Sequence, residues 1–187
     1  MVEADDEFDA REWTAELRTS RAEKDDFFAE HPQSPIPPEE REEFDGLSYY
    51  DPDPEYRVDA EVTVHDDPDP VEMDTTGGRP VRYLRVVTYS FGLDGESREL
   101  HAYRQETGDD DTLFVPFRDE TTGRRTYEKG RYMEFEPEGE LDDGETVTLD
   151  FNLAYGPFCA YSETFSCPLP PEENRLETAV EAGERDD

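Results

Sequence analysis

Lysine is nearly missing from this chain: of its 18 basic residues only Lys24 and Lys129 are lysines, and the rest are arginines. Against them stand 52 aspartates and glutamates, for a formal net charge of −34. Multimolar salt shortens the Debye length to about 3 Å or less, which screens the repulsion among these acids. We therefore interpret the acid excess as adaptation to a salt-rich cytoplasm, as in proteins of halophilic archaea. A surface for a cationic partner is the alternative.

Long apolar runs are absent as well. None approaches the roughly 20 residues that a membrane-spanning helix needs, and the N-terminus MVEADDEFDARE lacks a basic-then-apolar leader. A field this acidic also disfavours nucleic acid, because affinity there depends on cations that neutralise phosphates. We expect a soluble, cytoplasmic protein with neither a membrane nor a nucleic-acid partner.

Common catalytic and metal-binding signatures are also missing. The patterns G-x-S-x-G, H-E-x-x-H and C-x-x-C do not occur, no phosphate-binding glycine loop is present, and His31, His65 and His101 are dispersed. The acid pairs are too numerous to single out a general acid and a general base. The sequence therefore predicts no metal and no cofactor, and it leaves open whether the protein is an enzyme.

The apolar residues are few but clustered. They make up 33% of the chain, and the aromatic and β-branched ones gather between about residues 47 and 166, as in a folded core inside a charged shell. We expect one globular domain with three parts. Residues 1–45 form an N-terminal helix and a proline-rich connector, 46–168 an antiparallel β domain, and 169–187 a C-terminal helix with an acidic tail.

A helix is expected at each end of the chain. Within residues 5–30, apolar or long side chains recur at helical spacings, at Ala10, Trp13, Leu17, Lys24 and Phe28. The C-terminal segment PEENRLETAVEAGE begins with proline and acids, as helices often do, and it places Leu176, Ala179 and Val180 on one helical face.

Between the helices the sequence alternates with period two. From Tyr56 to Val64 apolar residues alternate with polar ones, as in a half-buried strand. Further strand candidates lie at 71–75, 80–91, 96–104, 112–117, 125–136, 146–154 and 159–165. The connectors TTGG, LDGE, TGDDD, DETTG and DDGE favour hairpins. The pattern predicts a mainly β fold, an antiparallel β-barrel or sandwich of about eight strands.

Three phrases point to a family: FVPFRDETTGRRTYEKGRYMEF at 114–135, LDFNLAYGPFCAYSETFSCPLPPEENRL at 149–176 and EAGE at 181–184. Through F-x-D-x-T-x-G, G-R-Y, D-F-N and C-P-L-P-P-x-E-N they resemble the family of domain of unknown function 1684, found in bacteria and archaea. The N-terminal half matches through a Trp-containing helix and the segment FDGLSYYDPDPEYRV. In one departure, Gly156-Pro157 stands where the family usually has Asn-Pro. The resemblance implies a fold and candidate positions, but no mechanism.

Two pairs of polar residues are candidates for ligand contacts. Asp150 and Asn152 alternate with apolar neighbours, so they either present a carboxylate and an amide to a ligand or cap a turn. Arg131 precedes Met133 in the same alternation, which places its guanidinium beside apolar side chains. It either pairs with Asp119 or Asp150, or clamps an anion together with Arg118. The segment 119–123 most simply closes a hairpin.

The aromatic stretch after Asp150 is the best candidate for a site. Tyr155, Phe158, Tyr161 and Phe165 fall within eleven residues, enough aromatic surface to line a pocket or to fill a core. With a hairpin tip at 162–164, Cys159 and Cys167 would face each other. They are buried free thiols, a bridge, or a nucleophile or metal ligand.

The sequence thus predicts a binding module for a small anionic molecule. Glu173 and Asn174 either cap the C-terminal helix or, with its free N–H groups, hold an anion. The predicted ligand-binding residues are Arg118, Asp119, Arg131, Tyr132, Asp150, Asn152, Tyr155, Cys159, Tyr161, Glu173 and Asn174. One alternative is an enzyme with hydrolase-like acid–base chemistry, in which Asp150 or Asp119 accepts a proton, Tyr155 donates one and Arg131 stabilises negative charge. The other is a structural or interaction protein with a filled interior.

Overall fold

The computed structural model describes residues 8–106, 112–136, 141–162 and 165–186. The chain divides into two compact units, Met1–Leu47 and Ser48–Asp187. No helix in these described ranges is long and apolar enough to cross a membrane.

The first unit contains α1 (Ala10–Glu30) and the 3₁₀ helix η1 (Pro38–Glu43). The predicted N-terminal helix is confirmed. It begins after Asp9, whose carboxylate accepts hydrogen bonds from two backbone N–H groups of the first turn at 3.0 and 3.2 Å. It ends at His31, which precedes a proline and has extended backbone. The connector contributes Phe44, whose ring centroid lies 6.1 Å from that of Phe28.

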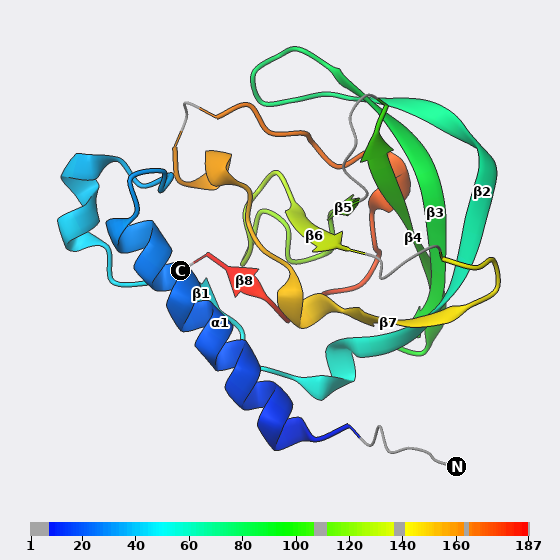
Figure 1. Cartoon of the computed structure of the whole chain (residues 1–187), viewed down its shortest axis with the longest axis horizontal. Coiled ribbons are helices and arrows are strands. Elements are labelled where there is room, and N and C mark those ends of the chain that lie inside the picture. The colour runs from blue at the N-terminus through cyan, green and yellow to red at the C-terminus, as the bar shows by residue number, and fades with distance from the viewer. Residues whose placement is uncertain (1–7, 107–111, 137–140, 163–164, 187) are drawn as a thin grey trace. The chain divides into compact units, whose positions relative to one another are not determined.

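The second unit is built on a six-stranded antiparallel sheet with the strand order β6-β5-β4-β3-β2-β7. Its strands are β2 (Arg57–Met73), β3 (Val81–Leu93), β4 (Glu96–Gln105), β5 (Leu113–Phe117), β6 (Arg131–Phe135) and β7 (Thr146–Asp150). Figure 1 shows this sheet strongly curved, in the form of a half barrel. A small second sheet pairs β1 (Ser48–Tyr49), which precedes the 3₁₀ helix η2 (Pro54–Tyr56), with β8 (Glu184–Arg185). The predicted mainly β, antiparallel fold is confirmed.

Of the two expected forms, barrel and sandwich, a closed barrel is wrong, because β6 and β7 are the two edges of the sheet. The chain leaves strand conformation at Asp150, whose carboxylate accepts a hydrogen bond from the backbone N–H of Asn152 at 2.9 Å. This cap starts the 3₁₀ helix η3 (Phe151–Leu153). The chain then returns to β6 through a bridge between Tyr155 and Tyr132, with backbone N···O distances of 2.8 and 2.9 Å. A bridge of one residue pair thus stands where a closed barrel would have a paired strand.

Several of the expected strands differ in detail. The candidates at 56–64 and 71–75 lie mostly within the single strand β2, whose pairing with β3 shifts register between Val64 and Asp69. The candidate at 159–165 instead holds the 3₁₀ helix η4 (Phe158–Ala160), and residues 163–164 lie outside the described part of the chain.

The predicted C-terminal helix is wrong. Beyond the 3₁₀ helix η5 (Glu172–Asn174), the described residues up to 186 contain no α-helix. Burial instead alternates with period two through Leu176, Thr178, Val180 and Ala182, which is typical of extended chain. The backbone also finds partners outside its own segment, since Leu176 N–H donates to Arg118 O at 2.7 Å. The spacing of the apolar residues in this segment suits an extended strand as well as a helix. The long-range hydrogen bonds stabilise the extended form.

One face of the sheet packs against the main hydrophobic core. Alternate residues of β5 and β6, including Val115, Phe117 and Met133, belong to this core. The extended C-terminal segment completes it with Leu176, Val180 and Ala182. The opposite face of the sheet carries a second, smaller cluster of Met73 (β2), Tyr83 (β3) and Tyr103 (β4), against which Phe114 of β5 packs.

Candidate functional site

Strand register gathers aromatic residues on the sheet face opposite the main core. Tyr103 of β4 pairs with Phe114 of β5, and Phe114 pairs with Glu134 of β6, so these three side chains share one face. Tyr132 precedes Glu134 by two residues and therefore points to that face as well.

A bulge in β3 adds Tyr83 to this group. Arg85 pairs with Tyr103 but Val87 pairs with Ala102, so Val86 is an extra residue on β3. Because side chains alternate between the two faces of a strand, one extra residue moves every side chain beyond it to the opposite face. Tyr83 therefore lies in the smaller cluster, whereas Val87 belongs to the main core.

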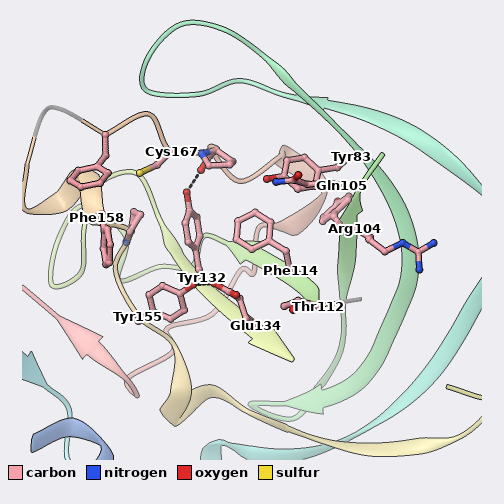
Figure 2. Close-up of a pocket in the computed structure, with 14 residues that line it drawn as sticks. Tyr83, Arg104, Gln105, Thr112, Phe114, Tyr132, Glu134, Tyr155, Phe158 and Cys167 are labelled. Carbon is pink, nitrogen blue, oxygen red and sulfur yellow. Dashed lines mark hydrogen bonds between the residues drawn. The ribbon is translucent and has the colours of Figure 1, made fainter. Parts of the chain in front are cut away.

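These side chains line a pocket of about 440 Å³ between the sheet and residues 155–158 and 165–168 (Figure 2). This volume falls within the range of pockets that hold small molecules. Half of the lining residues are aromatic: Tyr83, Tyr103, Phe114, Tyr132, Tyr155, Phe158 and Phe165. The others are Arg104, Gln105, Thr112, Glu134, Pro157, Cys167 and Pro168.

Four of the rings form a continuous row in which each ring contacts the next. The centroid distances are 5.6 Å from Tyr83 to Phe114, 4.6 Å from Phe114 to Tyr132, and 5.9 Å from Tyr132 to Tyr155. The last two pairs meet nearly at right angles, at 78° and 88°. Perpendicular neighbours form adjacent walls, so the row encloses space from more than one side.

Hydrogen bonds orient the tyrosine rings. The hydroxyl of Tyr132 donates to the backbone carbonyl of Pro168, a bond drawn in Figure 2. The hydroxyl of Tyr103 donates to Glu173, and that of Tyr155 donates to Glu134. Burial raises the pKa of all three phenols above the usual value of 10.0. Near neutral pH they therefore remain protonated donors and do not act as bases.

Among the described residues, two charged ones line the pocket, and they differ in direction. Glu134 lies beside the Tyr155 ring, facing the pocket, whereas the guanidinium of Arg104 extends away from the group of rings (Figure 2). Strand alternation explains the difference, since Arg104 follows Tyr103 and so points to the other face of β4. The charge that faces the pocket is thus a carboxylate.

Both cysteines are free thiols, and one of them lines the pocket. Burial, together with the neighbouring thiol of Cys159, raises the pKa of Cys167 to about 11. The Cys167 thiol therefore remains protonated at neutral pH, where it is a poor nucleophile. The expected facing strands are not present: Cys159 lies in η4, and the Cys167 N–H donates to the Thr76 hydroxyl at 3.0 Å.

Arg131 and Asp119 lie in the main core, away from the pocket. The Arg131 guanidinium, with 1% of the side chain exposed, donates to the backbone carbonyls of Val180, Ala182 and Glu184 and lies 3.6 Å from the Asp119 carboxylate. Of the two carboxylates expected as internal partners, Asp119 and Asp150, it is Asp119 that pairs with Arg131. An anion clamp at Arg131 would require this sealed arrangement to open.

Asp150 and Asn152 also satisfy each other. The Asp150 carboxylate accepts from the Asn152 backbone and side-chain N–H groups, each at 2.9 Å, and lies 3.5 Å from the Arg57 guanidinium. The Asn152 amide in turn bonds the backbone of Asp53. The turn-capping alternative is therefore confirmed for Asp150.

The remaining predicted residues are dispersed around the sheet. Arg118 pairs through its backbone with Arg175 in a parallel bridge, and the segment 119–123 lies, as expected, in the connection between the paired strands β5 and β6. The Tyr161 hydroxyl donates to the buried carboxylate of Glu184. The Cys159 sulfur accepts a hydrogen bond from the Tyr127 hydroxyl at 3.6 Å.

Glu173 and Asn174 do not cap a helix. Glu173 joins Tyr103 to Arg85, whose guanidinium donates to the Glu173 carboxylate at 2.8 Å. The Asn174 side chain bridges β4 and β5: it accepts from His101 N–H at 2.8 Å and donates to the carbonyls of His101 and Pro116 at 2.9 and 2.8 Å. It thus replaces the ladder hydrogen bonds where the two strands separate.

Of the predicted set, Tyr132 and Tyr155 line the pocket, and two of the other aromatic residues singled out, Phe158 and Phe165, join them. Sequence reasoning missed the residues that β3, β4 and β5 contribute. One signal was available: Phe114 lies between Leu113 and Val115, so the segment is apolar on both faces where a half-buried strand would alternate.

In the part of the chain that the structure describes, no group of three or more His, Cys, Asp and Glu side chains is placed to hold a metal ion.

Comparison with known proteins supports the resemblance that the motifs indicate. The model of a family described as Protein of unknown function (DUF1684) matches residues 42–185. The chain is also similar to the solution NMR structure of an uncharacterized protein from Haloarcula marismortui, with 66% sequence identity and a TM-score of 0.75. That similarity covers 95% of this chain and 96% of the other. A search of curated proteins finds no match. The haloarchaeal source of the neighbour is of the kind that the acidic composition indicates.

Proposed function

Because this chain belongs to the family Protein of unknown function (DUF1684), whose description states no activity, we propose its function from the pocket itself: the second unit binds a small molecule among the aromatic side chains. The observation that carries the proposal is the row of four rings, from Tyr83 to Tyr155, along a pocket of about 440 Å³. Small-molecule sites are concave and mostly apolar, with a few oriented polar groups.

The orientation of the rings supports a preformed site. Each of the hydroxyls of Tyr103, Tyr132 and Tyr155 is held by a hydrogen bond to a group of the protein. Their rings are therefore fixed before a ligand arrives, which lowers the entropic cost of binding.

Binding is better supported than catalysis. The phenols and the Cys167 thiol are protonated at neutral pH, and among the described lining residues Glu134 supplies the one carboxylate. General acid–base chemistry needs a positioned pair of groups with pKa values near the working pH. The described lining does not provide such a pair.

The ligand also differs from the anion that the sequence suggested. That expectation depended on Arg118 and Arg131, and neither residue lines the pocket. A carboxylate at the pocket makes an anion unfavourable there. The proposed ligand is therefore a small molecule with a substantial apolar part.

Fragment screening by NMR tests the proposal. Labelled protein at fixed high KCl is titrated with a library of small aromatic and aliphatic fragments, and chemical-shift changes are expected at Phe114, Tyr132 and Tyr155. Gln105→Trp, which adds an indole at the exposed rim of the pocket, should weaken binding about tenfold or more. Glu106→Trp adds the same indole next in sequence at a residue outside the lining and should leave binding unchanged. Shift changes confined to other surfaces, or equal effects of both variants, would overturn the proposal.

A further inference from the structure

The charge and arrangement of the lining narrow the class of ligand. We propose that the pocket binds an organic cation, a small molecule with an alkylated ammonium group; this inference rests on the binding function proposed above. Two features carry it: the direction of the charged groups, and the angles between the rings.

The charged groups favour a cation. Glu134 of β6 lies at the pocket, while the guanidinium of Arg104 extends away from it (Figure 2). A carboxylate accepts about four hydrogen bonds. The one that Tyr155 donates therefore leaves capacity for a positive group.

The rings favour a cation that carries alkyl groups. Phe114, Tyr132 and Tyr155 meet at 78° and 88°, so consecutive rings along the pocket lie in nearly perpendicular planes, as the walls of an aromatic box do. The faces of aromatic rings are electron-rich and attract cations within about 6 Å, and boxes of this kind recognise quaternary ammonium groups. An ammonium with bare N–H groups would lose more hydration on entering such walls than an alkylated one would.

High ionic strength also favours recognition by the rings over recognition by charge alone. At high ionic strength the attraction of an exposed carboxylate alone is screened over about 3 Å. Contact with ring faces is short-ranged and is screened much less. The rings should therefore supply most of the affinity, and Glu134 a smaller part.

A matched pair of probes isolates the charge. Choline and 3,3-dimethylbutan-1-ol have nearly the same shape, but only choline is charged. Each is titrated into labelled protein while KCl is adjusted to hold the ionic strength constant, and affinities are taken from the shifts of the pocket residues. Choline should bind at least about tenfold more tightly, because a cation over several rings gains on the order of this factor.

Two variants assign the preference to residues. Glu134→Gln should weaken choline binding about threefold to tenfold and leave the neutral probe unchanged. Phe114→Leu keeps an apolar wall but removes a ring face, so it should reduce the preference for choline over the alcohol. Glu136→Gln removes the same charge from an exposed residue outside the lining and serves as the control.

The outcomes separate the two proposals. Equal affinity for choline and the alcohol, or tighter binding of benzoate than of choline, overturns the cation assignment while the binding function stands. An unchanged choline affinity in both Glu134→Gln and Phe114→Leu also overturns it. If neither probe nor any fragment of the library shifts the pocket residues, both proposals fail.

Discussion

The guanidinium of Arg131 and the carboxylate of Asp119 form an ion pair inside the main core, with an N···O distance of 3.6 Å and side-chain exposures of 1% and 0%. Each partner also holds backbone of the C-terminal segment. Asp119 accepts from Val180 N–H at 2.6 Å, and Arg131 donates to the carbonyl of the same residue at 2.9 Å. The pair thus fastens an extended segment that has little regular secondary structure of its own.

Removing the guanidinium of Arg131 should therefore destabilise the folded state. Arg131→Met should lower the free energy of unfolding by about 3–5 kcal/mol, because Asp119 would remain charged and without its counter-ion in the core. Arg131→Lys should lose less, since lysine keeps the charge but lacks the planar fork. Urea unfolding at fixed KCl, followed by far-UV circular dichroism, measures both.

An exposed ion pair provides the control for Arg131. Arg125 and Glu181 lie 3.2 Å apart with side-chain exposures of 65% and 49%, so Arg125→Met should change stability by less than about 0.5 kcal/mol. Similar losses for the two arginine variants would contradict the anchoring role.

Replacing Asn174 should destabilise the fold as much as replacing a buried apolar residue. Its buried amide makes three hydrogen bonds to the backbones of β4 and β5, so Asn174→Ala removes the partner of the half-buried N–H and carbonyl of His101 and of the buried carbonyl of Pro116. Stability should fall by about 3 kcal/mol or more, since each such group costs about 1–3 kcal/mol. Hydrogen exchange at the His101 amide, which donates to Asn174, should accelerate. Glu172→Ala, at an exposed neighbour in η5, should leave that rate unchanged.

Two glycines with similar backbone angles should respond differently to alanine. At Gly183, with φ of +81°, a Cβ would lie 2.6 Å from the Ala154 carbonyl oxygen and 3.0 Å from that of Phe151. At Gly144, with φ of +86°, it would meet no described atom within 4 Å. Gly144→Ala should cost about 1–2 kcal/mol through φ alone. Gly183→Ala should cost at least about 2 kcal/mol more, because backbone must move. Equal unfolding midpoints for the two variants would contradict this.

His101 should make the protein less stable in acid. Its ring nitrogen Nδ1 lies 2.8 Å from the Thr88 hydroxyl, which lies 2.7 Å from Nε2 of His65. Burial lowers the pKa of His101 below 6.5; the charges of Arg85 and His65 lower it further, while those of Glu173 and Glu99 oppose the shift.

The sign follows from linkage. The unfolded chain takes up the His101 proton first as the pH falls through 6.5, so the folded state loses stability from there until the lower folded pKa is passed. His101→Gln removes this contribution. Between pH 8 and pH 5 at constant ionic strength, the wild-type protein should therefore lose more unfolding free energy than the variant. Parallel curves would show that His101 does not contribute.

Much of the fold could be predicted from local pattern. The helix after Asp9, the antiparallel strands and an internal carboxylate partner for Arg131 follow from spacing, alternation and the cost of burying a lone charge, whereas the structure decided between Asp119 and Asp150. The C-terminal helix failed for a physical reason: Leu176 and Val180 suit both a helical face and an alternating strand. The backbone partners that decide between them, such as Arg118, lie far away in the sequence.

One part of the pocket could also be predicted from the sequence, and the other part could not. Residues 155–165 stand out because aromatic side chains gather there within a very acidic chain, and that follows from the sequence by itself. The opposite wall comes from β3, β4 and β5, and only the tertiary structure decided it. A bulge at Val86 and the pairing of Tyr103 with Phe114 set which side chains face the pocket, and a shift of one residue in either would turn them toward the core.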